Sequence, residues 1–518
     1  MRPLKQGLTH PDVPVHEILR ARASEQPERV AVVASDRTLT LSELDSESNQ
    51  LAHGLRSVGL GPGDRLGVFL PNCPEFVIAF YAGSKLGAVA CPLNSSYRER
   101  EITYPLNDSG ATVLLTHSKV WPVVAAARPN LPHVRAIVVV GDEAPPLSAN
   151  AIRYAGLLAG QSADPPSGNV DPSQLVILPY SSGTTGMPKG VMLTHRNLVS
   201  NHEQYVRAMQ LGPGDSYIIY MPLSHIYGVA LMGSGIWSGA KQILLERFDL
   251  DAVVRLIQEH GVTWLFVVPP VLLTLASAPG LTAGQFQTIR YVFSAAGPLP
   301  PEVARRVEAR LGLRVIQGYG LTEASPATHN SPLEPARIKL ESGGIPVAAT
   351  EHRVVDLETG EATLGPGDVG EILVRGPQVM QGYWNAPEET ARALRGGWLH
   401  TGDVGWIDED EYVYIVDRKK EMIKYKSFSI APAELEALLL EHPDVADCGV
   451  TGAPDAEAGE VPKAFVVPHS GRQLDIQALA RFVAERVAGY KQIRRFEVVE
   501  SIPRTPSGKI LRRMLKEL

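Results

Sequence analysis

The sequence predicts an α/β protein with a large N-terminal domain, a small β-rich subdomain within it, and an α+β domain at the C-terminus. Three successive textures along the chain lead to this prediction. Apolar strand-like runs alternate with helical stretches up to about residue 317, short strands with frequent turns follow from about Gly343, and helices and strands mix again after Asp417. Because repeated strand–helix units form parallel sheets covered by helices, we expect the first part to be built in this way.

The overall composition restricts the class of protein. A chain of 518 residues is long enough for several packed layers, and its 44% apolar and 20% charged residues are typical of a soluble globular protein. The formal net charge of −7 argues against a nucleic-acid-binding protein. The cysteines (Cys73, Cys91 and Cys448) have no zinc-binding spacing and favour a reducing compartment. No apolar stretch is long enough to cross a bilayer, so we expect a cytoplasmic protein without a membrane span.

The predicted elements of the first 320 residues alternate regularly. Thr40 and Glu43 have the spacing of a capping box and begin an amphipathic helix. Further helices are expected at 75–86, 249–260 and 301–311, and strands at 30–34, 65–70, 88–93, 112–115, 136–140, 217–220, 242–245, 262–268, 291–294 and 314–317. Residues 161–172 are rich in serine, proline and aspartate and predict a surface linker.

The later elements are shorter and less regular. In the β subdomain, strands are expected at 352–356, 370–374 and 412–416. In the last domain, helices are expected at 432–441 and 476–488, and strands at 445–450, 464–467 and 494–499. This last part spans about 100 residues, which is a typical size for a separate domain.

Residues 180–191 (YSSGTTGMPKGV) form the most distinctive stretch of the chain. A buried strand at 174–180 precedes it, and Thr194 is a good N-cap for a helix that begins at His195. A Gly/Ser/Thr-rich loop between a strand and a helix presents backbone N–H groups to phosphate oxygens, and Lys189 adds a positive charge. The order of residues is not that of a Walker loop, which ends in Gly-Lys-Ser/Thr. We therefore predict a phosphate-binding loop rather than a flexible surface loop.

Six further motifs follow in a fixed order. They are MPLSHIYG at 221–228, SAAGPL at 294–299, QGYGLTE at 317–323, WLHTGD at 398–403, DRKKEMIK at 417–424 and PRTPSGKI at 503–510. With the loop at 180–191, they resemble the motifs of the adenylate-forming enzymes, which include acyl-CoA synthetases, luciferases and peptide-synthetase adenylation domains. The resemblance covers essentially the whole chain and is greatest to 4-coumarate–CoA ligases and their bacterial relatives.

This resemblance implies a reaction and an architecture. ATP and a carboxylic acid would give an acyl-adenylate and pyrophosphate, and the thiol of CoA would then attack the acyl-adenylate, with Mg²⁺ as cofactor. The N-terminal adenylation domain would span residues 1–416 and contain two sheet-plus-helix subdomains as well as the β subdomain. A hinge at 417–420 would precede a mobile C-terminal domain at 421–518, which carries the catalytic lysine and rotates about Lys420 between half-reactions. A homodimer is compatible with the resemblance.

The resemblance also assigns residues to each ligand. The catalytic group would comprise Lys509, His225 and Lys420. ATP and AMP would contact Ser181, Ser182, Gly183, Thr184, Thr185, Lys189, Ala296, Gln317, Gly318, Tyr319, Thr322, Asp403 and Arg418. The acid would contact His225, Tyr227, Ala295, Gly320 and Lys424, CoA would contact Arg247, Lys426 and Ser427, and Mg²⁺ would contact Thr184 and Glu323.

Several of these roles are chemically reasonable for the residue types alone. Glu323 offers hard oxygens to Mg²⁺, and Asp403 can accept hydrogen bonds from both ribose hydroxyls. Tyr319 has an aromatic face for adenine, and Arg418 offers several donors to the ribose or the α-phosphate. Lys509 can stabilise the charge that develops as the carboxylate attacks the α-phosphate. Each residue also has a simpler interpretation. These are a surface carboxylate for Glu323, a turn cap for Asp403, core packing for Tyr319, a surface ion pair for Arg418 and a solvated lysine for Lys509. For His225, the alternative is a satisfied core residue.

The sequence departs from the family pattern at four positions. Ser427 replaces a glycine where the pantetheine arm of CoA would pass, and its side chain puts the second half-reaction in question. Ser224, Ala295 and Glu411 are milder departures. The alternatives are therefore an enzyme that performs only one half-reaction, one that transfers the acyl group to a carrier-protein thiol or an amine, or a silent nucleotide-binding regulator.

The residues around the expected acid pocket are small or aliphatic and favour a bulky apolar or aromatic acid.

Overall fold

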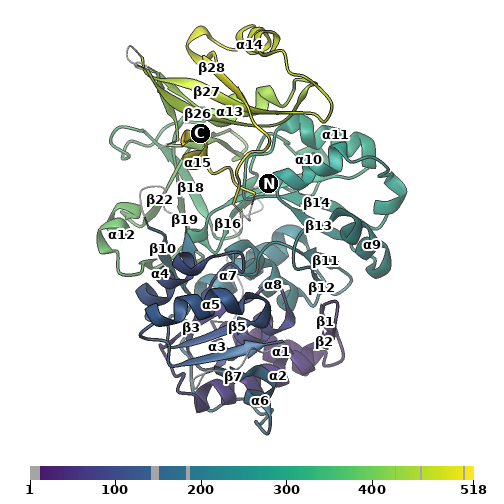
Figure 1. The fold of residues 1–518 in the computed structure, drawn as a ribbon, viewed down its shortest axis with the longest axis vertical. Helices are drawn as coiled ribbons and strands as arrows, with labels where there is room; N and C mark the ends of the chain where they lie inside the picture. The colour runs from purple at the N-terminus through teal and green to yellow at the C-terminus, as the bar shows by residue number, and fades with distance from the viewer. Residues whose placement is uncertain are drawn as a thin grey trace.

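The computed structural model describes residues 12–141, 151–181, 187–419, 421–425, 428–455, 458–505 and 508–517. These residues form two nine-stranded sheets in the N-terminal part and two smaller, five-stranded sheets. Figure 1 shows the C-terminal sheet at the top, above the rest of the molecule. The predicted α/β architecture is therefore confirmed. No helix among these residues is long and apolar enough to span a membrane.

The first large sheet has a parallel centre. Its strands, in spatial order, are β17 (Ile345–Pro346), β16 (Ala327–Asn330), β15 (Val315–Gly320), β14 (Tyr291–Ser294), β13 (Trp264–Val267), β11 (Ser216–Ile219), β12 (Lys241–Leu244), β1 (Val30–Val33) and β2 (Thr38–Thr40). The strands from β15 to β1 are parallel, and antiparallel strands extend both edges. The connecting helices are α8 (Ile226–Ser238), α9 (Leu250–His260), α10 (Pro269–Ser277) and α11 (Pro301–Leu311).

The second large sheet is mixed. Its order is β20 (Gly382–Tyr383), β10 (Lys189–Thr194), β8 (Leu175–Ile177), β4 (Val89–Pro92), β3 (Arg65–Phe69), β5 (Val113–His117), β6 (Ala136–Val140) and β7 (Ala151–Arg153), and β9 (Tyr180–Ser181) pairs with β10. The helices of this part are α1 (Val15–Glu25), α2 (Leu41–Ser57), α3 (Pro74–Lys85), α4 (Glu99–Ser109), α5 (Trp121–Ala127), α6 (Tyr154–Leu158) and α7 (His195–Met209). The predicted capping box of Thr40 and Glu43 begins α2. Strands β8, β9 and β20 are all antiparallel to β10.

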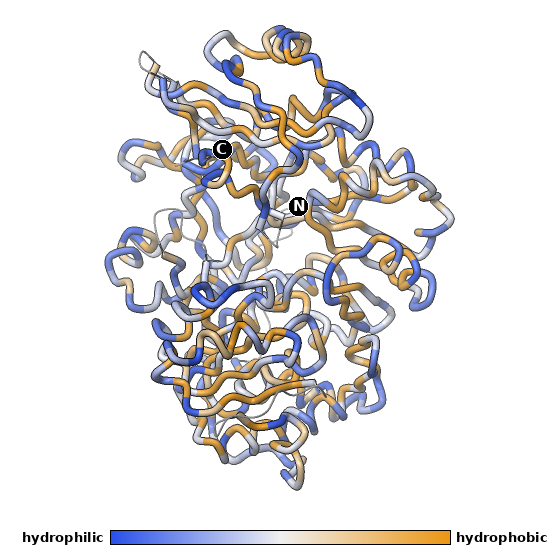
Figure 2. The backbone as a smooth tube through the Cα atoms, in the orientation of Figure 1, coloured by the Kyte–Doolittle hydropathy of each residue, from blue (hydrophilic) through white to orange (hydrophobic). Residues whose placement is uncertain are grey.

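One hydrophobic core supports both large sheets. It contains buried residues from Val15 on α1 to Val413 in the β subdomain, and includes the stacked aromatic side chains of β13 and β14. Figure 2 shows hydrophobic residues along the strands and hydrophilic residues in many of the outer loops. The predicted linker at 161–172 has no helix or strand, and Asn49 and Arg56 on α2 hold it through its backbone carbonyls.

The two small sheets correspond to the last two predicted parts. The β subdomain is antiparallel and contains β18 (Glu351–Val355), β19 (Gly370–Arg375), β21 (Leu394–Arg395), β22 (Trp398–Ile407) and β23 (Val413–Arg418), with α12 (Pro387–Ala393) beside it. The C-terminal part contains β24 (Ile423–Tyr425), β25 (Phe428–Ile430), β26 (Val445–Asp455), β27 (Gly459–Pro468) and β28 (Arg495–Val498), with α13 (Pro432–Leu439), α14 (Ile476–Ala484) and α15 (Arg512–Lys516). It has a hydrophobic cluster of its own, although the domain boundaries at 416 and 420 stay predictions.

Candidate active site

The predicted phosphate loop joins two antiparallel strands. Lys189 on β10 pairs with Ser181 on β9, and the intervening Ser182, Gly183, Thr184 and Thr185 lie outside the described residues. Thr194 caps α7 as predicted. However, the prediction of a loop that runs directly into this helix was wrong, because the six residues of β10 separate the two. Strand β10 therefore separates the N-terminus of α7 from the loop in sequence, and Lys189 on this strand is a described candidate for phosphate contact.

Tyr383 connects Lys189 to Glu323. The Lys189 ammonium lies 5.4 Å from the centre of the Tyr383 ring, and the Tyr383 hydroxyl donates a hydrogen bond of 2.8 Å to Glu323 Oε1. Burial, followed by the charge of Glu323, raises the pKa of Tyr383, which keeps the phenol protonated as a donor. Lys189 also lies 3.7 Å from Glu389 Oε1 on α12. Sequence reasoning missed Tyr383, because only the pairing of β20 with β10 brings it to this place.

The predicted ribose residues Asp403 and Arg418 meet the predicted adenine residue Tyr319 in a triad centred on the buried Asp403. Asp403 on β22 pairs directly with Arg418 on β23, and their side chains form an ion pair of 2.5 Å between Oδ1 and Nε. Tyr319 donates a hydrogen bond of 2.6 Å to the other carboxylate oxygen, Oδ2. The Asp403 side chain is 4% exposed, and each of its oxygens is held in position by one of these partners. The alternative of a turn cap for Asp403 is therefore not what the structure contains.

The glycines of the 317–323 motif allow close packing. Strands β15 and β16 form a hairpin with a β-bulge beside Gly320. A Cβ at position 320 would overlap the carbonyl oxygen of Pro326, and one at Gly318 would overlap the Phe293 ring. A 3₁₀ turn at Thr322–Ala324 then places Glu323 beside Tyr383. Both glycines thus have a packing role, whatever contact they make with a ligand.

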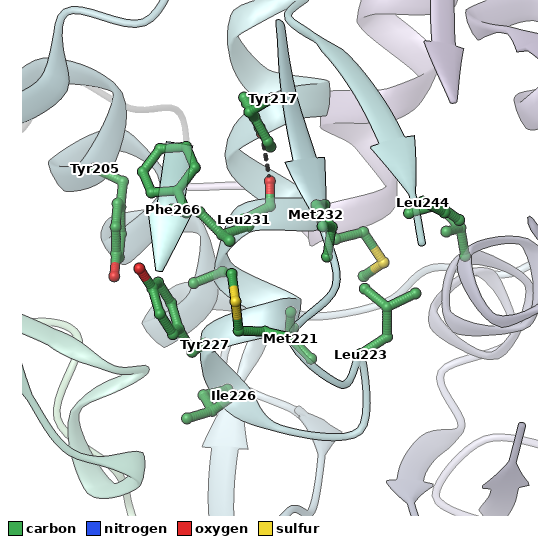
Figure 3. Packing of buried hydrophobic residues seen from close by; sticks show 14 of the residues in the cluster. Tyr205, Tyr217, Met221, Leu223, Ile226, Tyr227, Leu231, Met232, Leu244 and Phe266 are labelled. Carbon is green, nitrogen blue, oxygen red and sulfur yellow. Dashed lines mark hydrogen bonds between the residues drawn. The ribbon is translucent and has the colours of Figure 1, made fainter. Parts of the chain in front are cut away.

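The predicted acid-binding residues lie at the start of α8. His225 is the N-cap, and its Nδ1 accepts a hydrogen bond of 3.2 Å from the backbone N–H of Tyr227. Burial lowers the pKa of His225 to about 4, so the ring is neutral at pH 7. Tyr227 is 2% exposed, and its hydroxyl has no hydrogen-bond partner among the described residues. Figure 3 shows this hydroxyl directed toward that of Tyr205 on α7.

The C-terminal part brings Lys509 under the electrostatic influence of Asp403 and Arg418. Burial and the charge of Arg418 lower the pKa of Lys509, whereas the negative charges of Glu421 and Asp403 raise it. The preceding Gly508 has a φ of +83°, and a Cβ there would lie 3.2 Å from atoms of Pro270 and Val268 at the start of α10. The hairpin that carries Lys509 therefore packs directly against the large N-terminal part.

Other predicted residues are placed less tightly or are not described. Gln317 is on β15 beside the triad, and Ala296 is an exposed turn residue with a φ of +69°. Ala295 is partly buried, and Arg247 is exposed just after β12. Lys424 is exposed on β24, and its backbone N–H donates to Glu460. Lys420, Lys426 and Ser427 lie outside the described residues, so the predictions for them stay predictions.

Comparisons with known proteins agree with this architecture. A family model described as AMP-binding enzyme matches residues 19–384, and one described as AMP-binding enzyme C-terminal domain matches residues 434–509. A 4-coumarate–CoA ligase of Oryza sativa subsp. japonica is 39% identical over 526 residues, which cover 97% of this chain and 92% of that protein. A 4-coumarate–CoA ligase of Pinus taeda is 38% identical over 516 residues, covering 97% and 94%.

Solved structures superpose over nearly the whole chain. An anthranilate CoA ligase in complex with anthranoyl-AMP has a TM-score of 0.91 and 27% identity, with 98% of both chains covered. An amide bond synthetase from Marinactinospora thermotolerans has a TM-score of 0.86 and 28% identity, with 97% of this chain and 99% of that chain covered. The class of protein is thus an adenylate-forming ligase. The chain belongs to the AMP-binding enzyme family, as an acid–thiol ligase of the AMP-forming acyl-CoA synthetase type.

Proposed function

We propose that this enzyme activates a bulky apolar or aromatic carboxylic acid as its acyl-adenylate and then transfers the acyl group to CoA. The observation that carries the proposal is that the hairpin of Lys509 packs against the start of α10, where the charges of Asp403 and Arg418 act on the Lys509 ammonium. An adenylating enzyme needs a cation at the point where the acid meets the α-phosphate. The names of the similar 4-coumarate–CoA and anthranilate CoA ligases support an aromatic acid.

The nucleotide would lie between the phosphate loop and the Asp403 triad. Lys189 would neutralise charge on the β- and γ-phosphates, and Asp403 would accept hydrogen bonds from the ribose hydroxyls. Tyr319 would lie against the adenine through its ring while its hydroxyl holds Asp403. The remaining members of the predicted ATP and AMP group, from the loop and from residues 296 and 317–322, would complete the contacts.

A divalent cation is chemically compatible with Glu323. Its carboxylate is a hard-oxygen ligand of the kind that Mg²⁺ prefers, and the Tyr383 hydroxyl fixes its orientation. Thr184, the second predicted ligand, lies outside the described residues. When bound, Mg²⁺ would supply positive charge to the phosphate oxygens. The role of the chain here is to hold the Glu323 carboxylate beside Lys189.

In the first half-reaction, a carboxylate oxygen of the acid attacks the α-phosphorus of ATP. The bond from this phosphorus to the bridging oxygen breaks, and pyrophosphate leaves with the electron pair. Lys509 would donate to the oxygens that gain charge at the transition state. One such preorganised donor contributes roughly 10²–10³ in rate. The neutral ring of His225 and the buried Tyr227 would line the acid site.

In the second half-reaction, the CoA sulfur attacks the acyl carbonyl and AMP leaves. Arg247, Lys426 and Ser427 would contact CoA, and Lys424 would reach the acyl group after rotation about Lys420. This step would use the same two domains, 1–416 and 421–518, in a second arrangement. We place the reaction in the cytoplasm, since both ATP and CoA are available there.

A screen of carboxylic acids tests this proposal. Pyrophosphate release is measured with aliphatic and aromatic acids of increasing size, each with and without CoA, and the products are separated by mass. We expect acid-dependent release that is greatest with aromatic acids, together with a CoA thioester. Release without thioester formation would contradict the CoA step and favour a carrier-protein thiol or an amine as acceptor. No release with any acid would contradict the whole proposal.

A further inference from the structure

A buried ionic cluster surrounds Arg512 on α15. Its Nη2 donates to both carboxylate oxygens of Glu436, at 2.9 and 2.8 Å, and its Nε donates to the carbonyl of Val450 at 3.1 Å. Its Nη1 forms an ion pair with Glu421 and lies 3.9 Å from Asp417 Oδ1. The four charged side chains are between 4% and 17% exposed. One guanidinium thus holds three carboxylates.

These carboxylates lie at the start of the predicted hinge and after it. Asp417 ends the β subdomain, one residue before the Arg418 that pairs with Asp403. Its carboxylate also accepts hydrogen bonds from the backbone N–H groups of Arg418, at 2.7 Å, and Ala433, at 3.0 Å. Glu421 follows the hinge, and Glu436 is on α13. Arg512 therefore joins the strand that supports the ribose triad to the body of the C-terminal part.

Arg512 begins α15 just after the hairpin that carries Lys509. On the opposite side, Arg504 donates to Asp447 Oδ1 at 2.7 Å and to the carbonyl of Gly508 at 3.0 Å. Residues 504 and 510 form an antiparallel bridge that closes the hairpin. Lys509 is therefore held between two arginine anchors, and only the Arg512 anchor reaches the hinge. Arg512 is also among the charges that act on the Lys509 ammonium.

A contribution to stability does not account well for this cluster. Buried ion pairs lose so much solvation that apolar residues of similar volume are often as good or better for stability. Here the cost of burying the charged groups is larger, because three carboxylates share one guanidinium. Burial and the neighbouring acids accordingly raise the pKa of both Asp417 and Glu436. Such a network instead fixes a geometry, here the position of the Lys509 hairpin relative to Asp417 and Arg418.

We propose that Arg512 is a positioning residue for the adenylation step, which keeps Lys509 near the Asp403–Arg418 pair by clamping Asp417, at the start of the hinge, and Glu421, just after it. This inference rests on the proposed role of Lys509. It assigns no contact between Arg512 and substrate. A displacement of a catalytic group by about 1 Å can lower a rate by about 10²-fold, so loosening this clamp is expected to be visible in turnover.

The test is a double-mutant comparison in the full-length enzyme. Arg512→Gln, Lys509→Ala and the double variant are assayed by single-turnover release of pyrophosphate with enzyme in excess, which captures slow residual rates. We expect Arg512→Gln to lower the adenylation rate by about tenfold or more, with KM for ATP changed by less than about threefold, and to have little further effect when Lys509 is already alanine. The exposed neighbour Arg513 supplies the matched control Arg513→Gln, expected to behave as the parent enzyme.

Two outcomes would overturn the inference. One is an equal loss of rate from Arg512→Gln in both backgrounds, which would identify a general structural role. The other is no loss at all in the presence of Lys509. If Arg512→Gln does not fold, Glu421→Gln removes one clamped charge without a change of size and must show the same dependence on Lys509. A normal rate in Lys509→Ala alone would instead contradict the proposed function, so the two failures are distinguishable.

Discussion

The Tyr319 hydroxyl donates a hydrogen bond of 2.6 Å to Asp403, and this contact joins β15 of a large sheet to β22 of the β subdomain. Arg418 occupies the other carboxylate oxygen. The predicted adenine and ribose residues are therefore one unit. In this unit the acceptor is fixed before a nucleotide arrives, which reduces the ordering that binding requires.

Asp403→Asn is expected to weaken nucleotide binding. An amide offers one acceptor oxygen where the carboxylate offers two, and it removes the negative partner of Arg418. The loss of a hydrogen bond to a charged group is worth about 1.5–3 kcal/mol, which predicts a Kd for AMP about 10- to 100-fold higher by calorimetry. Tyr319→Phe, which leaves both oxygens and Arg418 in place, is expected to have a smaller effect. The reverse order would contradict the assignment of Asp403.

Tyr383→Phe is expected to raise the Mg²⁺ concentration needed for half-maximal adenylation. The variant keeps the ring beside Lys189 but removes the donor to Glu323, so the carboxylate loses its orientation. We expect an increase of about threefold or more, in line with a hydrogen bond worth about 1 kcal/mol. Tyr414→Phe is a matched control, because the Tyr414 hydroxyl donates at 3.1 Å to a different carboxylate, Asp408. An equal shift in both variants would count against a specific role for Tyr383.

Gly320→Ala is expected to destabilise the fold. The added Cβ would overlap a backbone oxygen, that of Pro326, which cannot move away as a flexible side chain could. Overpacking of this kind typically costs about 1–3 kcal/mol, measurable as a lower midpoint in urea unfolding. Gly214→Ala is the control, since nothing lies within 4 Å of a Cβ at that exposed position. Equal stability of the two variants would contradict the packing argument.

The stability of the protein is expected to fall on acidification. Burial lowers the pKa of His16, His195 and His202 from 6.5 to about 3. Between pH 6.5 and 3 the unfolded chain therefore binds protons that the folded chain excludes, so the stabilisation present above pH 6.5 is lost as the pH falls. Each histidine contributes up to about 1.4 kcal/mol per pH unit in this window.

Chemical unfolding measured between pH 7 and pH 5 tests this prediction. His202→Gln is expected to reduce the slope of unfolding free energy against pH, because His202 is 1% exposed. His133→Gln, at an exposed position, is expected to leave the slope unchanged. A slope that does not depend on His202 would show that other groups govern acid sensitivity.

The sequence predicted the elements well where local signals are strong. Thr40 with Glu43 and Thr194 before His195 are capping signals that act over three or four residues, and both helices begin where these residues place them. The strand–helix alternation likewise reflects local periodicity. Motifs such as 398–403 and 503–510 located Asp403 and Lys509 because each is contiguous in sequence.

Sequence reasoning failed where tertiary pairing decides the outcome. The short strand β20 places Tyr383 beside Lys189 across a separation of 194 residues, and no local pattern indicates this contact. In the same way, β10 pairs not only with β8 and β9, which precede it directly, but also with the distant β20. The carboxylates around Arg512 come from positions 417, 421 and 436, and they become a cluster only when the tertiary fold brings α15 beside α13 and the end of β23.

The central claim is that Lys509 drives acyl-adenylate formation. The most direct measurement compares the two half-reactions in Lys509→Ala: acid-dependent pyrophosphate release from ATP, and thioester formation from preformed acyl-AMP and CoA. We expect the first rate to fall by about 10²-fold or more and the second to stay within about threefold of the parent enzyme. An unchanged rate of pyrophosphate release would contradict the account.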